Sequence, residues 1–427
     1  MPITDTTLIA RSLKARLFST VTTVAVVGLG VALMLVLLGM RDAGEKAFSR
    51  GKGNMHILVS GAQQDPMVTV LNSVFYSGSP RNYLFITKRD ELLANNPLAW
   101  AIPTQLGDSY RGLPVMATTP EFFTLFEPAD GAPWRFAQGE PFDAPFEIVI
   151  GAEAARIRGL EMGDRVSLTH GTPKRGEEAH VHEEFVYEVV GVLEPTATLH
   201  DRAVFSDLTS SWILHAHDRR LNESGPDISL TTEADLIDED RKITGLYARV
   251  LTRPGMALSA IYQSAFNTLR QDPTITVAAP DQEISKLFTI VGNIDQIIVA
   301  LAATVLVVGA ITVMLVLYQA MEQRRRQIAV LRVLGCTKPR IFGLVVTESA
   351  IIGAAGAGVG ILLSVLGARV VADIMYRRLG LVIEPGFEPR IVLGMAVGTI
   401  ALASVAGIIP AVSAYRTSVI RNLRPAA

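Results

Sequence analysis

Residues 296–340 have the sequence QIIVALAATVLVVGAITVMLVLYQAM-EQRRRQIAVLRVLGC-TKPR. The first part, 296–321, carries no charge and exceeds the roughly 20 residues that a helix needs to cross a bilayer. The second part contains three successive arginines, Arg324 to Arg326, and Gly335 is a natural helix stop. Apolar side chains recur there at the spacing of one helix face: Ile328, Leu331 and Leu334. The pattern predicts a membrane span followed directly by a short basic, amphipathic helix.

Three other segments are long and apolar enough to cross a membrane, at 17–40, 341–374 and 391–415. Together with 291–321 they predict four transmembrane helices. The segment 17–40 follows basic residues, as a signal peptide does. Its apolar run is longer than the 7–15 residues of a signal-peptide core, and no clear A-x-A cleavage site follows. We therefore expect a retained signal anchor.

Lysine and arginine near the spans set the predicted orientation, because cytoplasmic segments carry an excess of both. Four spans place three basic segments on one side: an amphipathic N-terminus at 1–16, the loop 322–340 and the tail 416–427. The short loop 375–390 on the other side is a mild exception. The basic residues are Arg11, Lys14, Arg16, Arg324, Arg325, Arg326, Arg332, Lys338, Arg340, Arg416, Arg421 and Arg424. We expect this side to be cytoplasmic and the large segment between the first two spans to lie outside.

The composition agrees with a protein that is partly membrane-embedded. The chain has 427 residues, of which 49% are hydrophobic and 19% charged, below the roughly 25% typical of soluble domains. The net charge of −2 provides no attraction for nucleic acid, so no nucleic-acid partner is expected. The single cysteine, Cys336, excludes an internal disulfide. An external domain must then be stabilised by its own core.

The external segment alternates between strand-like and helix-like patterns at both of its ends, 41–110 and 241–290. These ends predict one α/β subdomain that is split in sequence by a β-rich insertion at 111–240. The insertion shows neither a catalytic elbow nor a phosphate loop. Residues 216–242 are polar and predict a long loop or a mobile flap. The predicted fold class is an α-helical membrane protein with four transmembrane helices plus a large α/β external domain.

The segment R-R-Q-I-A-V-L-R-V-L-G-C-T-K-P-R-I-F at 325–342, followed by Glu348 ahead of a Gly/Ala-rich span, resembles the MacB/FtsX type of ABC transporter permease. This is the type VII, or mechanotransmission, family. Its members typically have R-E-I-G-I-L-R-A-L-G-A-S here, and Gln327 departs from their usual Glu. Weaker similarities follow in the order the family has them: 122–126, 148–151, 160–164, 189–193 and 409–416. The resemblance covers nearly the whole chain, and its strength lies in this order and in the one-plus-three arrangement of spans.

The resemblance implies a non-catalytic permease subunit in a bacterial inner membrane, with a porter-like subdomain and its β-rich insertion in the periplasm. Such permeases dimerise and bind two copies of a separate cytoplasmic ATPase through the loop after the second span. This chain has no G-x-x-x-x-G-K-[ST] motif, so ATP and Mg are expected in the partner. The implied coupling residues are Arg325, Arg326, Ile328, Leu331, Arg332, Leu334 and Gly335. The alternative for this helix is interfacial packing against lipid headgroups.

Two glycine pairs in the third and fourth spans predict close helix packing. Gly356 with Gly360, and Gly394 with Gly398, are G-x-x-x-G pairs, which let helices approach closely. The alternative is that glycine is simply frequent in membrane helices.

Glu348 lies near the cytoplasmic start of the third span, where a carboxylate is costly without a partner. We expect it to pair with a cytoplasmic arginine in a structural role, rather than to carry protons.

The sequence has seven histidines, and all except His56 lie in the insertion. Four of them form H-x-H pairs, His180/His182 and His215/His217. On a strand, H-x-H places both rings on one face, which suits the start of a zinc site, although no third ligand can be assigned. The stretch 180–196 is similar to a subgroup of these permeases that is associated with metal homeostasis. His180 and His182 are thus candidate zinc ligands, and the alternative is a solvated loop with incidental histidines.

Three functional hypotheses follow. The favoured one is a permease that couples ATP hydrolysis in a partner to periplasmic work, exporting or extracting a lipoprotein, peptide, toxin or metal-linked cargo. It favours a homodimer over a heterodimer and allows a periplasmic adaptor or cargo protein as partner. The second is an FtsX-like transmembrane regulator of a periplasmic hydrolase. The third, a tethered enzyme, leaves the cytoplasmic coupling loop unexplained.

Overall fold

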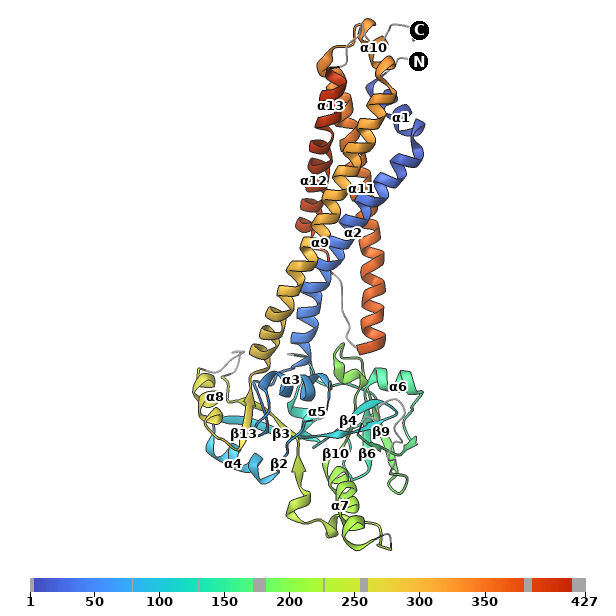
Figure 1. Ribbon diagram of the computed structural model, residues 1–427. Coiled ribbons are helices and arrows are strands. Elements are labelled where there is room, and N and C mark those ends of the chain that lie inside the picture. Colours follow the sequence, from blue (N-terminus) through green and yellow to red (C-terminus); the bar gives the residue numbers. More distant parts are fainter. Residues whose placement is uncertain are drawn as a thin grey trace. The chain divides into compact units, whose positions relative to one another are not determined.

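The computed structural model describes residues 4–78, 80–129, 131–171, 182–225, 227–253, 260–379 and 386–416. The chain forms two compact units (Figure 1). The membrane unit comprises Met1–Gly44, Val291–Ile374 and Ile383–Ala427, and the external unit comprises Glu45–Ile290 with Met375–Val382.

The membrane unit is helical. Among the described residues, four helices are long and apolar enough to span a bilayer: Leu17–Gly51, Val299–Gln323, Lys338–Tyr376 and Pro389–Tyr415. They belong to α2 (Leu17–Gly51), α9 (Pro280–Gln323), α11 (Lys338–Leu379), and α12 (Pro389–Ala406) with α13 (Ile408–Tyr415). This confirms the four predicted spans. Two short helices, α1 (Asp5–Ala15) and α10 (Arg325–Val333), lie at the end of this unit that carries α13.

Local sequence sets the limits of both short helices. Helix α1 begins after Thr4, whose side chain and that of Thr7 form a reciprocal capping box. Helix α10 follows α9 after a single residue, Arg324, and ends before Gly335, which has a φ of +95°. Glycine adopts this left-handed backbone without a steric penalty, so α10 stops where the sequence predicted.

The external unit is built on one mixed sheet with the strand order β13-β1-β12-β3-β4-β10-β6-β9-β5; β7 also pairs with β9, and β8 with β3. The strands are β1 (Ile57–Gly61), β3 (Leu98–Tyr110), β4 (Leu113–Thr118), β5 (Phe136–Gly139), β6 (Glu147–Ile150), β7 (Arg165–Val166), β8 (Thr169–His170), β9 (Tyr187–Leu193), β10 (Val204–Asp207), β12 (Gly245–Val250) and β13 (Ile275–Ala278). A separate pair joins β2 (Leu84–Phe85) to β11 (Lys242–Ile243). The mixed α/β character confirms the predicted fold class.

The sheet has a flanking half and an inserted half. Strands β13, β1, β12 and β3 come from the two ends of the external segment, whereas β4, β10, β6, β9 and β5 come from the insertion. The halves meet at the β3–β4 hairpin, whose turn residues Arg111 and Gly112 both have positive φ. Each half has its own apolar core, one around Ile57, Leu246 and Phe266, the other around Ile148, Tyr187 and Val204.

Helices cover both halves. The flanking half carries α3 (Pro66–Phe75), α4 (Thr87–Asn95) and α8 (Tyr262–Arg270), and the insertion carries α5 (Glu121–Leu125), α6 (Ala152–Arg158) and α7 (Leu208–Ser224). Helix α7 corrects the predicted loop at 216–242, because its last turns occupy the start of that stretch. Asp207 initiates the helix by accepting hydrogen bonds from the backbone amides of Thr209 and Ser210.

Candidate functional site

The predicted coupling residues lie on α10 and directly after it. Ile328 and Ala329 are buried, and Ile328 belongs to an apolar cluster with residues of α9, α11 and α13. Leu331 is half-buried. It lines, with Ile328, a pocket of about 130 Å³ that α1, α10 and α11 enclose. One side of α10 is therefore seated against the rest of the membrane unit.

The opposite side of α10 is exposed and apolar. Val330, Val333 and Leu334 are 44%, 63% and 77% exposed, and Arg325 and Arg326 lie exposed beside them. We call these five residues the outward face of α10. Sequence analysis grouped Leu334 with Ile328 and Leu331, but the structure divides that set. Residues six apart on a helix point about 120° away from each other, so Leu334 faces solvent while Ile328 faces inward.

A buried polar cluster holds the start of α10 against the rest of the membrane unit. The Arg16 guanidinium donates to the Glu348 carboxylate, with Nη2 2.5 Å from Oε1, and the Ser12 hydroxyl donates to the same oxygen at 2.6 Å. Arg324 Nη1 donates to Ser12 Oγ at 2.6 Å. The side chains of Arg16 and Glu348 are only 14% and 6% exposed. This confirms that Glu348 pairs with an arginine from a predicted cytoplasmic segment.

The cluster joins three segments that are distant in sequence. Ser12 lies on α1, Arg324 is the residue between α9 and α10, and Glu348 lies on α11. A second, exposed ion pair joins the same region, with Arg340 Nη2 2.6 Å from Asp5 Oδ1. Movement of α10 relative to α1 or α11 would therefore break charged hydrogen bonds in a poorly hydrated place, where such losses are large.

The two glycine pairs differ in their surroundings. A Cβ on Gly356 would lie 2.6 Å from Val27 Cγ1, and one on Gly360 would lie 2.5 Å from Val31 Cβ. Both glycines thus let α11 approach α2 closely. Around Gly394 and Gly398, by contrast, the described residues leave open space. Gly353 makes a further close contact, because a Cβ there would lie 2.6 Å from the Ala403 Cβ. No G-x-x-x-G spacing marks this glycine in the sequence.

The candidate zinc ligands are only partly placed. His180 lies outside the described residues, whereas the imidazole of His182 is fully buried. His182 lies near His170, and His170 near His215, with ring centroids 6.3 and 5.4 Å apart. The neighbouring Asp108 carboxylate raises the pKa of His170. Sequence analysis named neither His170 nor Asp108 as a ligand, because their proximity depends on strand pairing.

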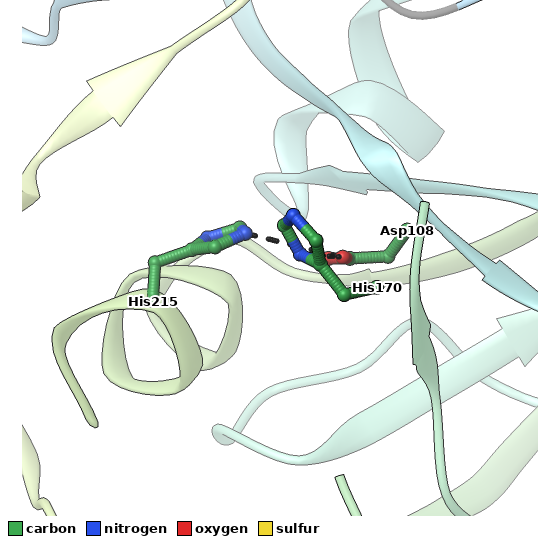
Figure 2. A group of neighbouring side chains, drawn as sticks. All are labelled: Asp108, His170 and His215. Atoms are coloured by element: carbon green, nitrogen blue, oxygen red, sulfur yellow. Dashed lines mark ion pairs between the residues drawn. The ribbon is translucent and has the colours of Figure 1, made fainter. Parts of the chain in front are cut away.

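The H-x-H pair at 215 and 217 lies on α7 rather than on a strand. Its two rings therefore point to different sides of the helix. His217 is buried, with Nδ1 2.9 Å from Thr231 Oγ1 and its ring against Phe185. His215 points toward Asp108 and His170, as Figure 2 shows.

Two family models match the chain. The MacB-like periplasmic core domain matches residues 20–283, and the FtsX-like permease C-terminal model matches residues 299–419. An uncharacterized ABC transporter permease of Methanocaldococcus jannaschii is 26% identical over 153 residues, which are 36% of this chain and 38% of that relative. The matched stretch therefore spans well under half of the relative's length.

A solved structure is also similar, the extracellular domain of the noncanonic ABC-type transporter YknZ from Gram-positive bacteria. The likeness covers 52% of this chain and 98% of that domain, with a TM-score of 0.28 and 8% identity. The MacB-like model by itself covers more than half of the chain, and the FtsX-like model covers the last three spans. The protein is thus a membrane protein with a large external domain, and it belongs to the MacB/FtsX-like family of ABC transporter permeases.

Proposed function

We propose that this chain couples ATP hydrolysis in a separate cytoplasmic ATPase to conformational work in its external unit. The observation that carries the proposal is the outward face of α10. Apolar side chains flanked by arginines are exposed on a helix whose other side is held by a core and a buried charge cluster. A partner that binds this face would be able to move the helices to which α10 is fixed.

The route of the work follows chain connectivity. Only one residue separates α10 from α9, and α9 is helical from Pro280, next to β13, to Gln323. ATP shifts an equilibrium only by binding one arrangement more tightly than the other. We infer that closure of two ATPase copies favours one arrangement of two permease copies, each supplying one α10. We further propose that the protein lies in a bacterial inner membrane with its external unit in the periplasm. There the conformational work would export or extract a lipoprotein, peptide, toxin or metal-linked cargo.

The test is co-purification of the detergent-solubilised chain with a candidate ABC ATPase from the same organism, comparing wild type with Leu334→Asp. The matched control is Leu251→Asp, because Leu251 is similarly exposed, at 53%, but belongs to the external unit. We expect Leu334→Asp to reduce ATPase capture at least tenfold and the control to leave it unchanged. Equal capture by all three proteins would contradict docking on the outward face.

The second candidate, an FtsX-like regulator of a periplasmic hydrolase, shares the C-terminal permease region. The match of 20–283 to a MacB-like periplasmic core favours the transporter. Reconstitution separates the two functions. A transporter will release or extract cargo from proteoliposomes when ATP is supplied, whereas a regulator will instead raise the activity of an added cell-wall hydrolase without moving cargo.

A further inference from the structure

Five side chains with metal-ligating atoms meet in the external unit, far in sequence from the coupling helix. They form two overlapping groups, Asp108 with His170 and His215, and His170 with His182 and Asp218. Within each group the ligand atoms lie within 4.8 Å of one another. The measured pairs are His170 Nδ1 to Asp108 Oδ1 at 3.4 Å, His215 Nε2 to Asp108 Oδ1 at 3.9 Å, and His182 Nε2 to Asp218 Oδ2 at 3.9 Å.

A strand pair and a helix position these side chains. His170 on β8 is the register partner of Asp108 on β3, and directly opposed residues on paired strands hold their side chains close together. His215 and Asp218 are three residues apart on α7, so they share one face of that helix. Figure 2 shows the His215 and His170 rings converging beside the Asp108 carboxylate. Secondary structure therefore places four of the five side chains, and His182 lies outside the helices and strands.

Oxygen atoms beside two of the imidazoles orient their rings in the way that metal-binding histidines are oriented. Ser211 Oγ lies 3.4 Å from His215 Nδ1, which leaves Nε2 directed at Asp108. Glu184 Oε1 lies 3.3 Å from His182 Nδ1, which leaves Nε2 directed at Asp218. An oxygen on one ring nitrogen fixes the tautomer and presents the other nitrogen to a metal.

Burial and access also suit a bound cation. The Asp108 side chain is only 8% exposed, and its Oδ1 receives no hydrogen bond of good geometry from the described residues. A buried carboxylate oxygen in that condition is costly, and a cation would remove the cost. His170 and His215 also line an open cavity of about 540 Å³. An ion can thus enter from solvent and keep one position for water or another ligand.

The donor set selects the metal. Imidazole nitrogen with carboxylate oxygen suits zinc and other late first-row divalent ions, whereas calcium and magnesium prefer oxygen alone. We propose that the external unit binds one divalent transition-metal ion, Zn²⁺ by preference, through Asp108, His170 and His215, with His182 and Asp218 beside it. Three protein ligands and an open fourth position describe an accessible zinc site rather than a closed structural one.

The test uses the full chain in detergent, stripped with a chelator and dialysed against Zn²⁺, with metal content measured by mass spectrometry. We expect about one zinc per chain in wild type, and at least tenfold weaker binding in His170→Gln and His215→Gln, as loss of a ligand entails. His217→Gln is the matched control, since His217 lies on the same helix but outside the cluster. Co²⁺ substitution should give the intense visible absorption of four-coordinate cobalt, and His170→Gln should abolish it.

Three outcomes would overturn the assignment. The first is no stoichiometric zinc in wild type, and the second is zinc that persists in the His170→Gln/His215→Gln double variant. Zinc lost in His182→Gln but retained in His215→Gln would also overturn it, in favour of the second group. If a variant fails to fold, wild type alone decides: bound zinc should protect His170 and His215 from acylation by diethyl pyrocarbonate, as mapped by peptide mass spectrometry. The result is independent of ATPase capture, so either proposal can fail alone.

Discussion

Arg16 Nη2 and Glu348 Oε1 lie 2.5 Å apart, although 332 residues separate the two side chains in sequence. Arg16 follows α1 at the start of the first span, and Glu348 lies near the start of the third. The Ser12 hydroxyl also donates to Glu348, and Arg324 donates to Ser12, so the four side chains form one hydrogen-bonded cluster. The pair thereby connects the start of the first span to α11, the helix that follows α10.

Removing one member of this pair should destabilise the membrane unit strongly. Glu348→Ala leaves Arg16 without its carboxylate partner in a buried place, which costs about 3–5 kcal/mol in comparable cases. We expect a clearly lower melting temperature in detergent. Arg340→Ala is the control, because the Arg340–Asp5 pair is exposed and exposed pairs contribute little. Equal melting temperatures for Glu348→Ala and wild type would show that the pair has no stabilising role.

The two sides of α10 should respond differently to a charge. Ile328→Asp buries a carboxylate in the apolar cluster with Ile341 and Val345, so we expect both a lower melting temperature and lost ATPase capture. Leu334→Asp places the same charge in solvent, so capture should fall while the melting temperature stays at the wild-type value. A thermal-shift assay run on the co-purification samples distinguishes these results. A large loss of stability in Leu334→Asp would mean that this side chain is buried within the membrane unit.

The two glycine pairs provide a direct packing test. Gly360→Ala would place a Cβ 2.5 Å from Val31 Cβ, so α11 and α2 must separate, at a cost of about 1–3 kcal/mol. Gly398→Ala meets open space in the same membrane unit and should not lower the melting temperature. Differential scanning fluorimetry of both variants is sufficient. The reverse order of effects would be incompatible with the observed contact between α2 and α11.

The external unit should lose stability in mild acid because of His200. Burial lowers the pKa of His200 from 6.5 to about 4. As pH falls below 6.5, the unfolded chain takes up a proton at this residue, whereas the folded chain does not until about pH 4. The contribution of His200 to the free energy of unfolding is thus constant above pH 6.5. It falls by up to about 3 kcal/mol as the pH is lowered from 6.5 to about 4.

Urea unfolding of the full chain at pH 7.5 and pH 5, followed by tryptophan fluorescence, measures this loss. Trp134 reports locally, because its ring centroid lies 5.8 Å from that of His200. His200→Gln should reduce the difference between the two pH values, since glutamine does not titrate. An unchanged difference would assign the acid sensitivity to other groups.

Sequence patterns predicted what depends on local order. Uncharged runs located the four spans, and Gly335 marked the end of the short helix α10. Helix α7 was predicted in part as a loop, because its polar second half lacks an apolar period. Its inner residues are buried by strands far away in sequence, including β4 and β3, and β3 carries Asp108. The same long-range pairing explains the candidate metal ligands. The sequence pattern pointed to His180 and His182 of an H-x-H motif, but not to the cluster of Asp108, His170 and His215.

Helix α10 illustrates the same limit at shorter range. The amphipathic period of 325–334 was visible, but not which apolar stripe would be covered, because α11 and α13 decide that. Glu348 was expected to pair with an arginine, yet only the fold selects Arg16 and positions Ser12 between it and Arg324.

The pairing of β1 with β13 has a consequence for how this protein can move. Helix α2 leads into β1 and β13 leads into α9, so the first two spans attach to neighbouring strands. Their ladder aligns Leu58 with Ala278 and Gly61 with Ile275. Sliding by one residue would turn every buried side chain of β1 to the opposite face of the sheet. The fixed register of this ladder therefore couples α2 to α9. The two helices can tilt or bend together, but one cannot slide along its axis past the other while the external unit stays folded.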